Sequence, residues 1–178
     1  DGVIIDSVNI KGWAFGKLFG HYPEYIDEII AFHYANGGMS RFDKFRYIYK
    51  HIINIDLLDT KLDQICVEFS KLVYNRVIDC RYIEGTIEFL KKYSGRIPCF
   101  IVSGTPHDEL KAIVKARGIS HYFKGLYGSP TTKSAWVKVI IEDQKLNLRR
   151  ILFVGDALSD YDAAKQHGIF FVGRVNDI

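Results

Sequence analysis

The run from Ile151 to Asp160 constrains the fold more than any other part of the chain. Four apolar residues that begin at Ile151 are followed directly by Gly155 and Asp156. A short apolar run that ends in Gly-Asp is typical of the carboxyl end of a buried parallel strand in an α/β sheet. Ligands of open α/β sheets bind beyond such strand ends. The two carboxylates, Asp156 and Asp160, therefore suit a hard divalent cation, although Ser159 or Asp160 would serve equally well as a helix N-cap.

The second half of the chain predicts strands that alternate with helices. Apolar strands are predicted at 97–102, 122–127, 151–154 and 169–172, and helices at 85–93, 107–117, 134–143 and 160–167. Strands that alternate with helices favour a parallel sheet covered by helices on both faces. We therefore expect an α/β fold with a doubly wound parallel sheet.

The first half of the chain has helical periodicity and almost no strand signals. Its longest predicted helix covers residues 62–78, with one apolar face. The glycines at 37 and 38 interrupt the pattern, and Ser40 opens another helix, with Asp43 three residues later in a loose capping arrangement. The layout predicts an α/β core made of residues 1–7 and 83–178, interrupted by a helical insert at residues 8–82.

Length and composition limit the classes of function. A chain of 178 residues can form one core with a small inserted domain. The net charge of +3 does not indicate a nucleic-acid partner, and no apolar run approaches the roughly 18 residues of a membrane span. The three cysteines, Cys66, Cys80 and Cys99, match no zinc or disulfide pattern, which fits a reducing cytoplasm. We therefore expect a cytoplasmic protein that binds neither nucleic acid nor membrane.

Polar residues follow the predicted strand ends. These are Ser103, Gly104 and Thr105 after the strand at 97–102, Ser129, Thr131, Thr132 and Lys133 after the strand at 122–127, and Asp156 and Asp160 after the strand at 151–154. Asp1 would join them if another strand lay just upstream. Hydroxyl and backbone N–H groups at a helix start bind anions, lysine adds positive charge, and carboxylates suit Mg²⁺. Together they predict a phosphoryl site, whereas each alone is explained by helix capping or surface exposure.

Taken in order, these motifs resemble those of the haloacid dehalogenase-like superfamily of phosphatases and phosphomutases. The resemblance rests on Asp1-Gly-Val-Ile-Ile-Asp-Ser7 for the tail of the first motif, Ile101-Val-Ser-Gly-Thr105 for the second, Lys133 for the third and Val154-Gly-Asp-Ala-Leu-Ser-Asp160 for the fourth. It spans essentially the whole chain, and the helical insert stands where the family has its helical cap. In the family, the nucleophilic aspartate precedes the position of Asp1 by two residues. The resemblance therefore implies that the nucleophile and the first strand lie upstream of this sequence.

The resemblance implies a Mg²⁺-dependent phosphatase that hydrolyses a small phosphorylated metabolite, such as a sugar phosphate, through an aspartyl-phosphate. The implied roles are catalysis for Asp1, Ser103 and Lys133, phosphate binding for Ser103, Gly104 and Lys133, and metal binding for Asp1, Asp156 and Asp160. Asp1 would act as general acid and then as general base. Two alternatives stay open: a phosphomutase of the β-phosphoglucomutase type, and a non-catalytic binding module on the same fold.

The segment from Gly37 to Lys44 resembles the specificity loop of helical-cap members. Arg41 could pair with an anionic group of the substrate, since a guanidinium suits phosphate or carboxylate, and Lys44 is a second candidate. A solvated basic helix face explains both residues nearly as well. Weaker candidates are Arg46, Asn9 and Lys11.

Overall fold

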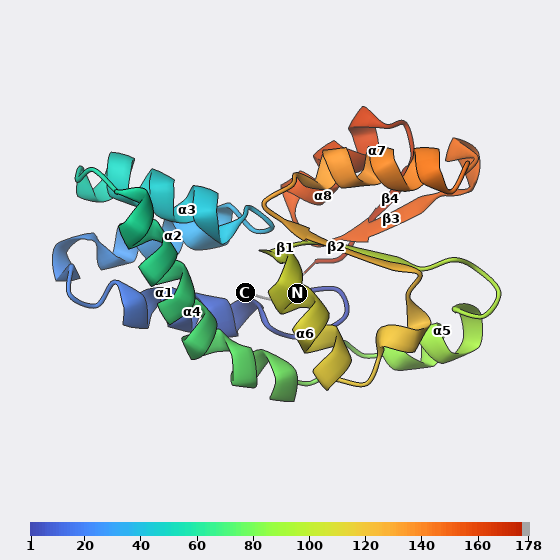
Figure 1. Ribbon diagram of the computed structural model, residues 1–178, viewed down its shortest axis with the longest axis horizontal. Helices are drawn as coiled ribbons and strands as arrows, with labels where there is room; N and C mark the ends of the chain where they lie inside the picture. The colour runs from blue at the N-terminus through green and yellow to red at the C-terminus, as the bar shows by residue number, and fades with distance from the viewer. Residues whose placement is uncertain (176–178) are drawn as a thin grey trace.

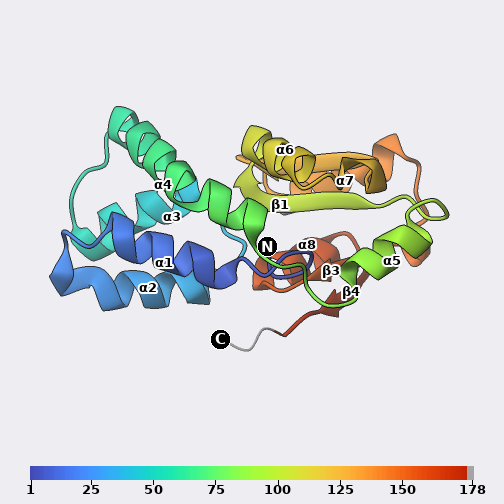
Figure 2. The ribbon, with the colours of Figure 1, turned by 90° about the horizontal axis from the view of Figure 1, so that it is seen from below.

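The computed structural model describes residues 1–175, which form two units that lie side by side (Figures 1 and 2). The helical unit comprises residues 8–79 and the α/β unit comprises the rest of the described chain. Residues 176–178, which the sequence assigns to the core, lie outside the described residues. The predicted α/β class with an inserted helical segment is confirmed. Within residues 1–175, no helix is both long enough and apolar enough to cross a membrane.

The helical unit contains four α-helices. They are α1 (Val8–Leu18), α2 (Ile26–Ala35), α3 (Arg41–Tyr47) and α4 (Asp59–Asp79), with a 3-10 turn at Pro23–Tyr25 and a π-helical turn at Ile48–Ile53. The predicted cap of α3 is confirmed, because the Ser40 hydroxyl accepts a hydrogen bond of 3.2 Å from the backbone N–H of Asp43. This cap satisfies one of the otherwise unpaired N–H groups at the start of the helix.

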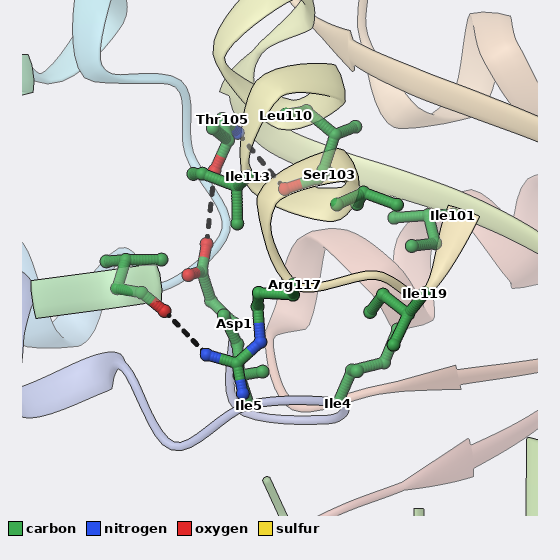
Figure 3. A pocket seen from close by; sticks show the side chains of 12 residues that line it. Asp1, Ile4, Ile5, Ile101, Ser103, Thr105, Leu110, Ile113, Arg117 and Ile119 are labelled. Carbon is green, nitrogen blue, oxygen red and sulfur yellow. Dashed lines mark hydrogen bonds between the residues drawn. The ribbon is translucent and has the colours of Figure 1, made fainter. Parts of the chain in front are cut away.

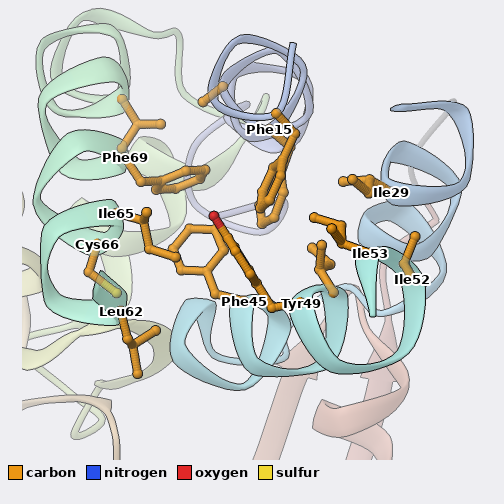
Figure 4. Packing of buried hydrophobic residues seen from close by; sticks show 14 of the residues in the cluster. Phe15, Ile29, Phe45, Tyr49, Ile52, Ile53, Leu62, Ile65, Cys66 and Phe69 are labelled. Atoms are coloured by element: carbon orange, nitrogen blue, oxygen red, sulfur yellow. The ribbon is translucent and has the colours of Figure 1, made fainter. Parts of the chain in front are cut away.

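Aromatic rings from three helices form the centre of the helical unit (Figure 4). Phe15 of α1, Phe45 of α3 and Phe69 of α4 are each at most 1% exposed. The ring of Phe15 lies 5.0 Å from that of Phe69 and 5.5 Å from that of Phe45, measured between centroids. Burial of each such side chain stabilises the fold by about 1.5–3 kcal/mol. The helical unit thus has a hydrophobic core of its own.

The α/β unit alternates strands and helices as predicted. Its elements are α5 (Thr86–Tyr93), β1 (Phe100–Pro106), α6 (His107–Ala116), β2 (Gly125–Ser129), α7 (Lys133–Asp143), β3 (Leu152–Gly155), α8 (Leu158–Gln166) and β4 (Phe170–Gly173), with 3-10 turns at Ser120–Tyr122 and Leu148–Arg150. β1 pairs in parallel with β2, and β3 pairs in parallel with β4. Within the described chain, the strands therefore form two parallel pairs rather than one continuous sheet.

Each strand begins later than the sequence pattern predicts. The clearest case is β1, which was expected from residue 97 and begins at Phe100. The backbone N–H of Ile97 donates a hydrogen bond of 2.9 Å to the carbonyl of Tyr93, the last residue of α5. Pro98 then follows without an N–H to offer a neighbouring strand. The apolar run therefore begins at residue 97, whereas the backbone can pair with a neighbouring strand only from Phe100.

The helical unit is attached through two neighbouring connections. Ile5 and Tyr82 form an antiparallel bridge, and the backbone N–H of Asp6 donates to the Arg81 carbonyl at 3.0 Å. Next to them, the Arg117 guanidinium donates to carbonyl groups at the end of α4, including that of Cys80 at 2.8 Å. Basic side chains stabilise helix carboxyl ends in this way. These contacts hold the helical unit over the carboxyl ends of β1 and β3.

Candidate active site

The Asp1 carboxylate lies at the junction of the two units and has partners from both. Oδ1 accepts a hydrogen bond of 2.5 Å from the Ser7 hydroxyl, and Oδ2 accepts one of 3.2 Å from the Thr105 hydroxyl (Figure 3). Lys11 of α1 forms an ion pair with the same Oδ2 and donates to Thr105 Oγ1 at 3.2 Å. The Asp1 side chain is still 25% exposed. The carboxylate is therefore held in one orientation and remains accessible.

Lys11 contributes more to this site than the sequence suggested. The pKa of Lys11 is lowered to about 8, chiefly by burial and then by the Arg41 guanidinium, while the Glu109 and Asp156 carboxylates oppose the shift. The ammonium is still the main form at neutral pH. Lys11 was only a weak candidate in the sequence, because no motif at the start of the first helix marks it as a site residue.

Lys133 and Asp160 form a buried ion pair. The Lys133 ammonium, at the first residue of α7, lies 2.6 Å from Asp160 Oδ1, and Asp160 is 4% exposed. Asp160 Oδ2 accepts a hydrogen bond of 3.2 Å from the backbone N–H of Ala157. Because both carboxylate oxygens have protein partners, the arrangement favours Asp160 as the residue that orients Lys133 over Asp160 as a direct metal ligand.

Asp156 lies against the backbone of the first residues. A Cβ placed on Gly2 would lie 1.7 Å from Asp156 Oδ2, so a side chain at this position would displace the Asp156 carboxylate. Gly2 also has a φ of +66°, a conformation that other residues rarely adopt. The glycine at position 2 thus allows the Asp156 carboxylate to lie in direct contact with the backbone beside Asp1.

The charges of the later motifs surround Asp1. Lys11, Asp156, Lys133 and Asp160 all lie within electrostatic range of the backbone nitrogen of Asp1. Groups that lie more than 100 residues apart in the chain are therefore within electrostatic range of one point.

Ser103 and Gly104 lie within β1 and not after its end as the sequence predicted, because β1 continues to Pro106. The Ser103 hydroxyl accepts a hydrogen bond of 3.1 Å from the backbone N–H of Thr105. Ser103 and Asp1 both line a mainly apolar cavity of about 50 Å³ (Figure 3). Gly104 meets the helical unit instead, because a Cβ placed on it would lie 2.8 Å from the Gly38 carbonyl oxygen.

A loop of the helical unit, residues 36–40, lies on the strand ends. A Cβ placed on Gly38 would lie 2.6 Å from Lys133 Nζ and 2.4 Å from Ser159 Oγ, and Gly38 has a φ of +76°. The Ser159 hydroxyl is buried and has no hydrogen-bond partner among residues 1–175. The sequence indicated a specificity loop here. In the structure the backbone of the loop at Gly38 lies against Lys133.

The basic residues after this loop have three different surroundings. Arg41 is 5% exposed and donates to Glu109 Oε2 at 2.9 Å and Oε1 at 2.6 Å. Lys44 is 4% exposed and its ammonium lies 3.0 Å from the carbonyl oxygen of His33. Arg46 is 55% exposed and pairs with Asp59 at 3.2 Å. Sequence reasoning missed Glu109, which reads as an ordinary acidic residue in the first turn of α6.

The donor set at the strand ends fits a hard cation that keeps much of its water. Mg²⁺ is usually bound through one or two carboxylates, with waters and substrate oxygens completing its shell. Asp156 offers a carboxylate that lies directly against the backbone at Gly2. Within residues 1–175, no group of three acidic, histidine or cysteine side chains could hold a metal by protein ligands alone.

Comparison with solved structures finds the same fold in several bacterial proteins. One is described as a β-phosphoglucomutase from Thermotoga maritima. It has 17% sequence identity and a TM-score of 0.69, and the match covers 100% of this chain and 83% of the other. Another is described as a phosphoglycolate phosphatase from Haemophilus somnus. It has 18% sequence identity and a TM-score of 0.73, and the match covers 97% of this chain and 81% of the other. CbbY from Rhodobacter sphaeroides, solved in complex with phosphate, has 13% sequence identity and a TM-score of 0.76. That match covers 99% of this chain and 83% of the other.

At these identities the structural likeness is evidence of fold. No curated protein was found to match the chain. The model of the haloacid dehalogenase-like hydrolases matches residues 1–174, which is nearly the whole chain. The resemblance seen in the motifs and the predicted enzyme class are therefore confirmed, and the chain belongs to the haloacid dehalogenase-like hydrolase family.

Proposed function

We propose that the protein is a Mg²⁺-dependent phosphatase that hydrolyses a small phosphorylated metabolite, such as a sugar phosphate. The observation that carries this proposal is the surroundings of Asp1. Its carboxylate is held by Lys11, Ser7 and Thr105, and charges from two later motifs lie around it. The proposal is also supported by the solved structures described as a phosphoglycolate phosphatase and a β-phosphoglucomutase.

The attacking carboxylate is expected two residues before Asp1 in the full protein, where it would form an aspartyl-phosphate. The Lys133 ammonium, held by Asp160 at 2.6 Å, would neutralise charge on the phosphoryl oxygens. The Ser103 hydroxyl and the Gly104 backbone N–H would donate hydrogen bonds to the same oxygens. Mg²⁺, held by Asp156 and by the chain at Asp1, would supply further positive charge to the phosphoryl group.

Asp1 would move the protons of the reaction. It would first donate a proton to the leaving alkoxide and then accept one from the attacking water. Lys11 and the hydroxyl groups of Ser7 and Thr105 all donate to its carboxylate in this arrangement, which stabilises the charged form. These donors therefore suit the second step, in which Asp1 accepts a proton.

The test is an assay of the protein with its complete N-terminus. Purified protein with Mg²⁺ should release inorganic phosphate from some of a panel of phosphomonoesters, and chelation of Mg²⁺ or Asp156→Asn should remove this activity. Isomerised sugar phosphate without net phosphate release would instead establish the phosphomutase alternative. Absence of both products across the panel, with the folded state verified, contradicts the proposal.

We also propose a cytoplasmic location, which is supported by the free thiols of Cys66, Cys80 and Cys99.

A further inference from the structure

Arg174 is bonded to both segments that carry the acidic residues of the candidate active site. Its backbone N–H donates a hydrogen bond of 2.7 Å to the carbonyl of Gly155, the residue next to Asp156. Its guanidinium Nη1 donates one of 2.7 Å to the carbonyl of Gly2, the residue next to Asp1. One residue therefore holds the immediate neighbours of both carboxylates.

The backbone of Arg174 has a fixed position at the carboxyl end of β4. β3 and β4 are paired in parallel as far as Gly155 and Gly173, and the bond from the Arg174 N–H to Gly155 continues this pairing by one residue. The Arg174 side chain is partly buried, so it does not extend freely into solvent. The guanidinium thus reaches the first residues of the chain from a rigid anchor beside Asp156.

A second contact from a distant part of the chain holds the same turn at a later residue. The Thr86 hydroxyl donates a hydrogen bond of 3.2 Å to the carbonyl of Val3. Arg174 acts at the carbonyl of Gly2, which is closer to Asp1 in the chain. A hydrogen bond from a guanidinium is also roughly twice as strong as one from a neutral hydroxyl, because the donor is charged. Arg174 is therefore the stronger of these two contacts and the one nearer to the Asp1 carboxylate.

The conformation of Gly2 explains why the contact with Arg174 affects the site. Gly2 has a φ of +66°, and its backbone lies directly against the Asp156 carboxylate. Rotation of the peptide group that carries the Gly2 carbonyl would change the position of Asp1 relative to Asp156. Arg174 opposes this rotation, because its guanidinium fixes the direction of that carbonyl.

We infer that Arg174 is a positioning residue that keeps Asp1 and Asp156 in the arrangement that binds Mg²⁺. This inference rests on the proposed function and adds a residue that no motif in the sequence indicated. Arg174 acts through the backbone of Gly2 and Gly155 rather than by contact with substrate or cation. Groups that orient metal ligands typically contribute about 10–100-fold to metal affinity or activity. The effect of Arg174 should therefore be measurable in cation binding itself.

The experiment measures the binding of Mn²⁺, by electron paramagnetic resonance, to the protein with its complete N-terminus and without substrate. Mn²⁺ prefers the same oxygen ligands as Mg²⁺ and is visible to this method. Arg174→Met removes the hydrogen-bond donor and keeps an unbranched side chain. It should raise the Kd for Mn²⁺ about tenfold or more. The Mg²⁺ concentration needed for half-maximal phosphatase activity should rise by a similar factor.

Further variants separate positioning from a general effect on the fold. Thr86→Val removes the hydrogen bond to Val3 in the same turn, and it should lower Tm without changing the Kd for Mn²⁺. Arg150→Met, at an exposed arginine of the α/β unit, should change neither quantity. Arg174→Lys keeps a charged donor, so it should recover part of the affinity that Arg174→Met loses.

A Kd for Mn²⁺ in folded Arg174→Met equal to that of wild type would overturn the inference and leave the phosphatase proposal intact. An equal loss of affinity in Arg174→Met and Thr86→Val would also overturn it, because the cause would then be the stability of the turn.

If Arg174→Met does not fold, hydrogen exchange of the wild type decides. Mg²⁺ should slow exchange at residues 1–7 and 170–175 together, since a ligand stabilises the segments that hold its site. Unchanged exchange at 170–175 would contradict the inference. Failure of the wild type to bind Mn²⁺, or to hydrolyse any ester, would instead refute the proposed function itself.

Discussion

The Arg41 guanidinium of the helical unit and the Glu109 carboxylate of the α/β unit form a buried ion pair with two hydrogen bonds. The bonds measure 2.9 and 2.6 Å, and the two side chains are 5% and 10% exposed. The Ser70 hydroxyl of α4 lies 2.6 Å from both partners. The pair therefore connects α3 and α4 with α6, and it depends on the two units staying together.

Removal of one partner of this pair should destabilise the protein strongly. Arg41→Met or Glu109→Leu leaves a buried charge without compensation, and we expect each to lower the free energy of unfolding by about 3–5 kcal/mol. The double variant should cost less than the sum, because neither charge remains. Urea unfolding of the four proteins measures the coupling. Asp59→Asn, at the exposed pair with Arg46, is the control and should cost about 1 kcal/mol or less. Additive effects of Arg41→Met and Glu109→Leu would contradict this account.

A side chain at Gly38 should prevent the loop from seating on Lys133. Gly38→Ala would place a Cβ 2.6 Å from Lys133 Nζ and 2.4 Å from Ser159 Oγ. Gly85→Ala is the matched control, because Gly85 has nearly the same φ, +77°, and no atom within 4 Å of its added Cβ. Both variants should lose about 1–2 kcal/mol of stability from backbone strain. We expect kcat/KM to fall at least about tenfold in Gly38→Ala alone, since a displacement near 1 Å has large effects on catalysis. Equal kcat/KM in both variants would show that the loop does not contribute to the site.

Loss of the Asp1 charge should abolish turnover without unfolding the protein. Asp1→Asn keeps the size of the side chain but cannot exchange a proton, and we expect kcat to fall about 10²–10⁴-fold. Asp6→Asn is the control, because the Asp6 carboxylate forms an exposed ion pair with Arg81 at 3.0 Å. Thermal unfolding should be similar for the two variants. Undiminished hydrolysis of a phosphate ester by Asp1→Asn would remove Asp1 from the mechanism.

His33 should make the protein less stable in acid. Its pKa is lowered from the ordinary 6.5 to about 3 in the folded chain, chiefly by burial and then by Lys44 and Lys11. The unfolded chain therefore binds an additional proton between these two pH values. The stability present above pH 6.5 is lost as the pH falls through this window, by at most about 1.4 kcal/mol per pH unit.

The measurement is the free energy of unfolding of wild type and His33→Asn between pH 3 and 8. The variant lacks this titration, so its stability relative to wild type should rise as the pH falls below 6.5. The pKa values of Lys44 and Lys11, about 7 and 8, lie above the window and should not obscure it. The exposed His51 provides the control His51→Asn. A parallel pH dependence for wild type and His33→Asn would show that His33 is not held neutral in the folded chain.

Local patterns in the sequence predicted the secondary structure well. The helix expected at 107–117 is observed at His107–Ala116, and the helix expected from residue 134 begins at Lys133. These elements follow from side-chain spacing and from capping and turn residues within a few positions of each other. The same patterns placed Asp156 directly after a strand, whereas Ser103 and Gly104 lie within β1, which continues to Pro106.

The sequence by itself determined which elements form and which chemical groups the chain offers at their ends, since both depend on neighbours a few residues apart. Only the tertiary structure decided how those groups are paired. Arg41 and Glu109 are 68 residues apart, and Thr105 is 104 residues from Asp1. Such contacts exist because the helical unit docks on the α/β unit. The same docking pairs Arg41 and leaves Lys44 buried beside a neutral histidine, a distinction between two basic residues that no local pattern contains.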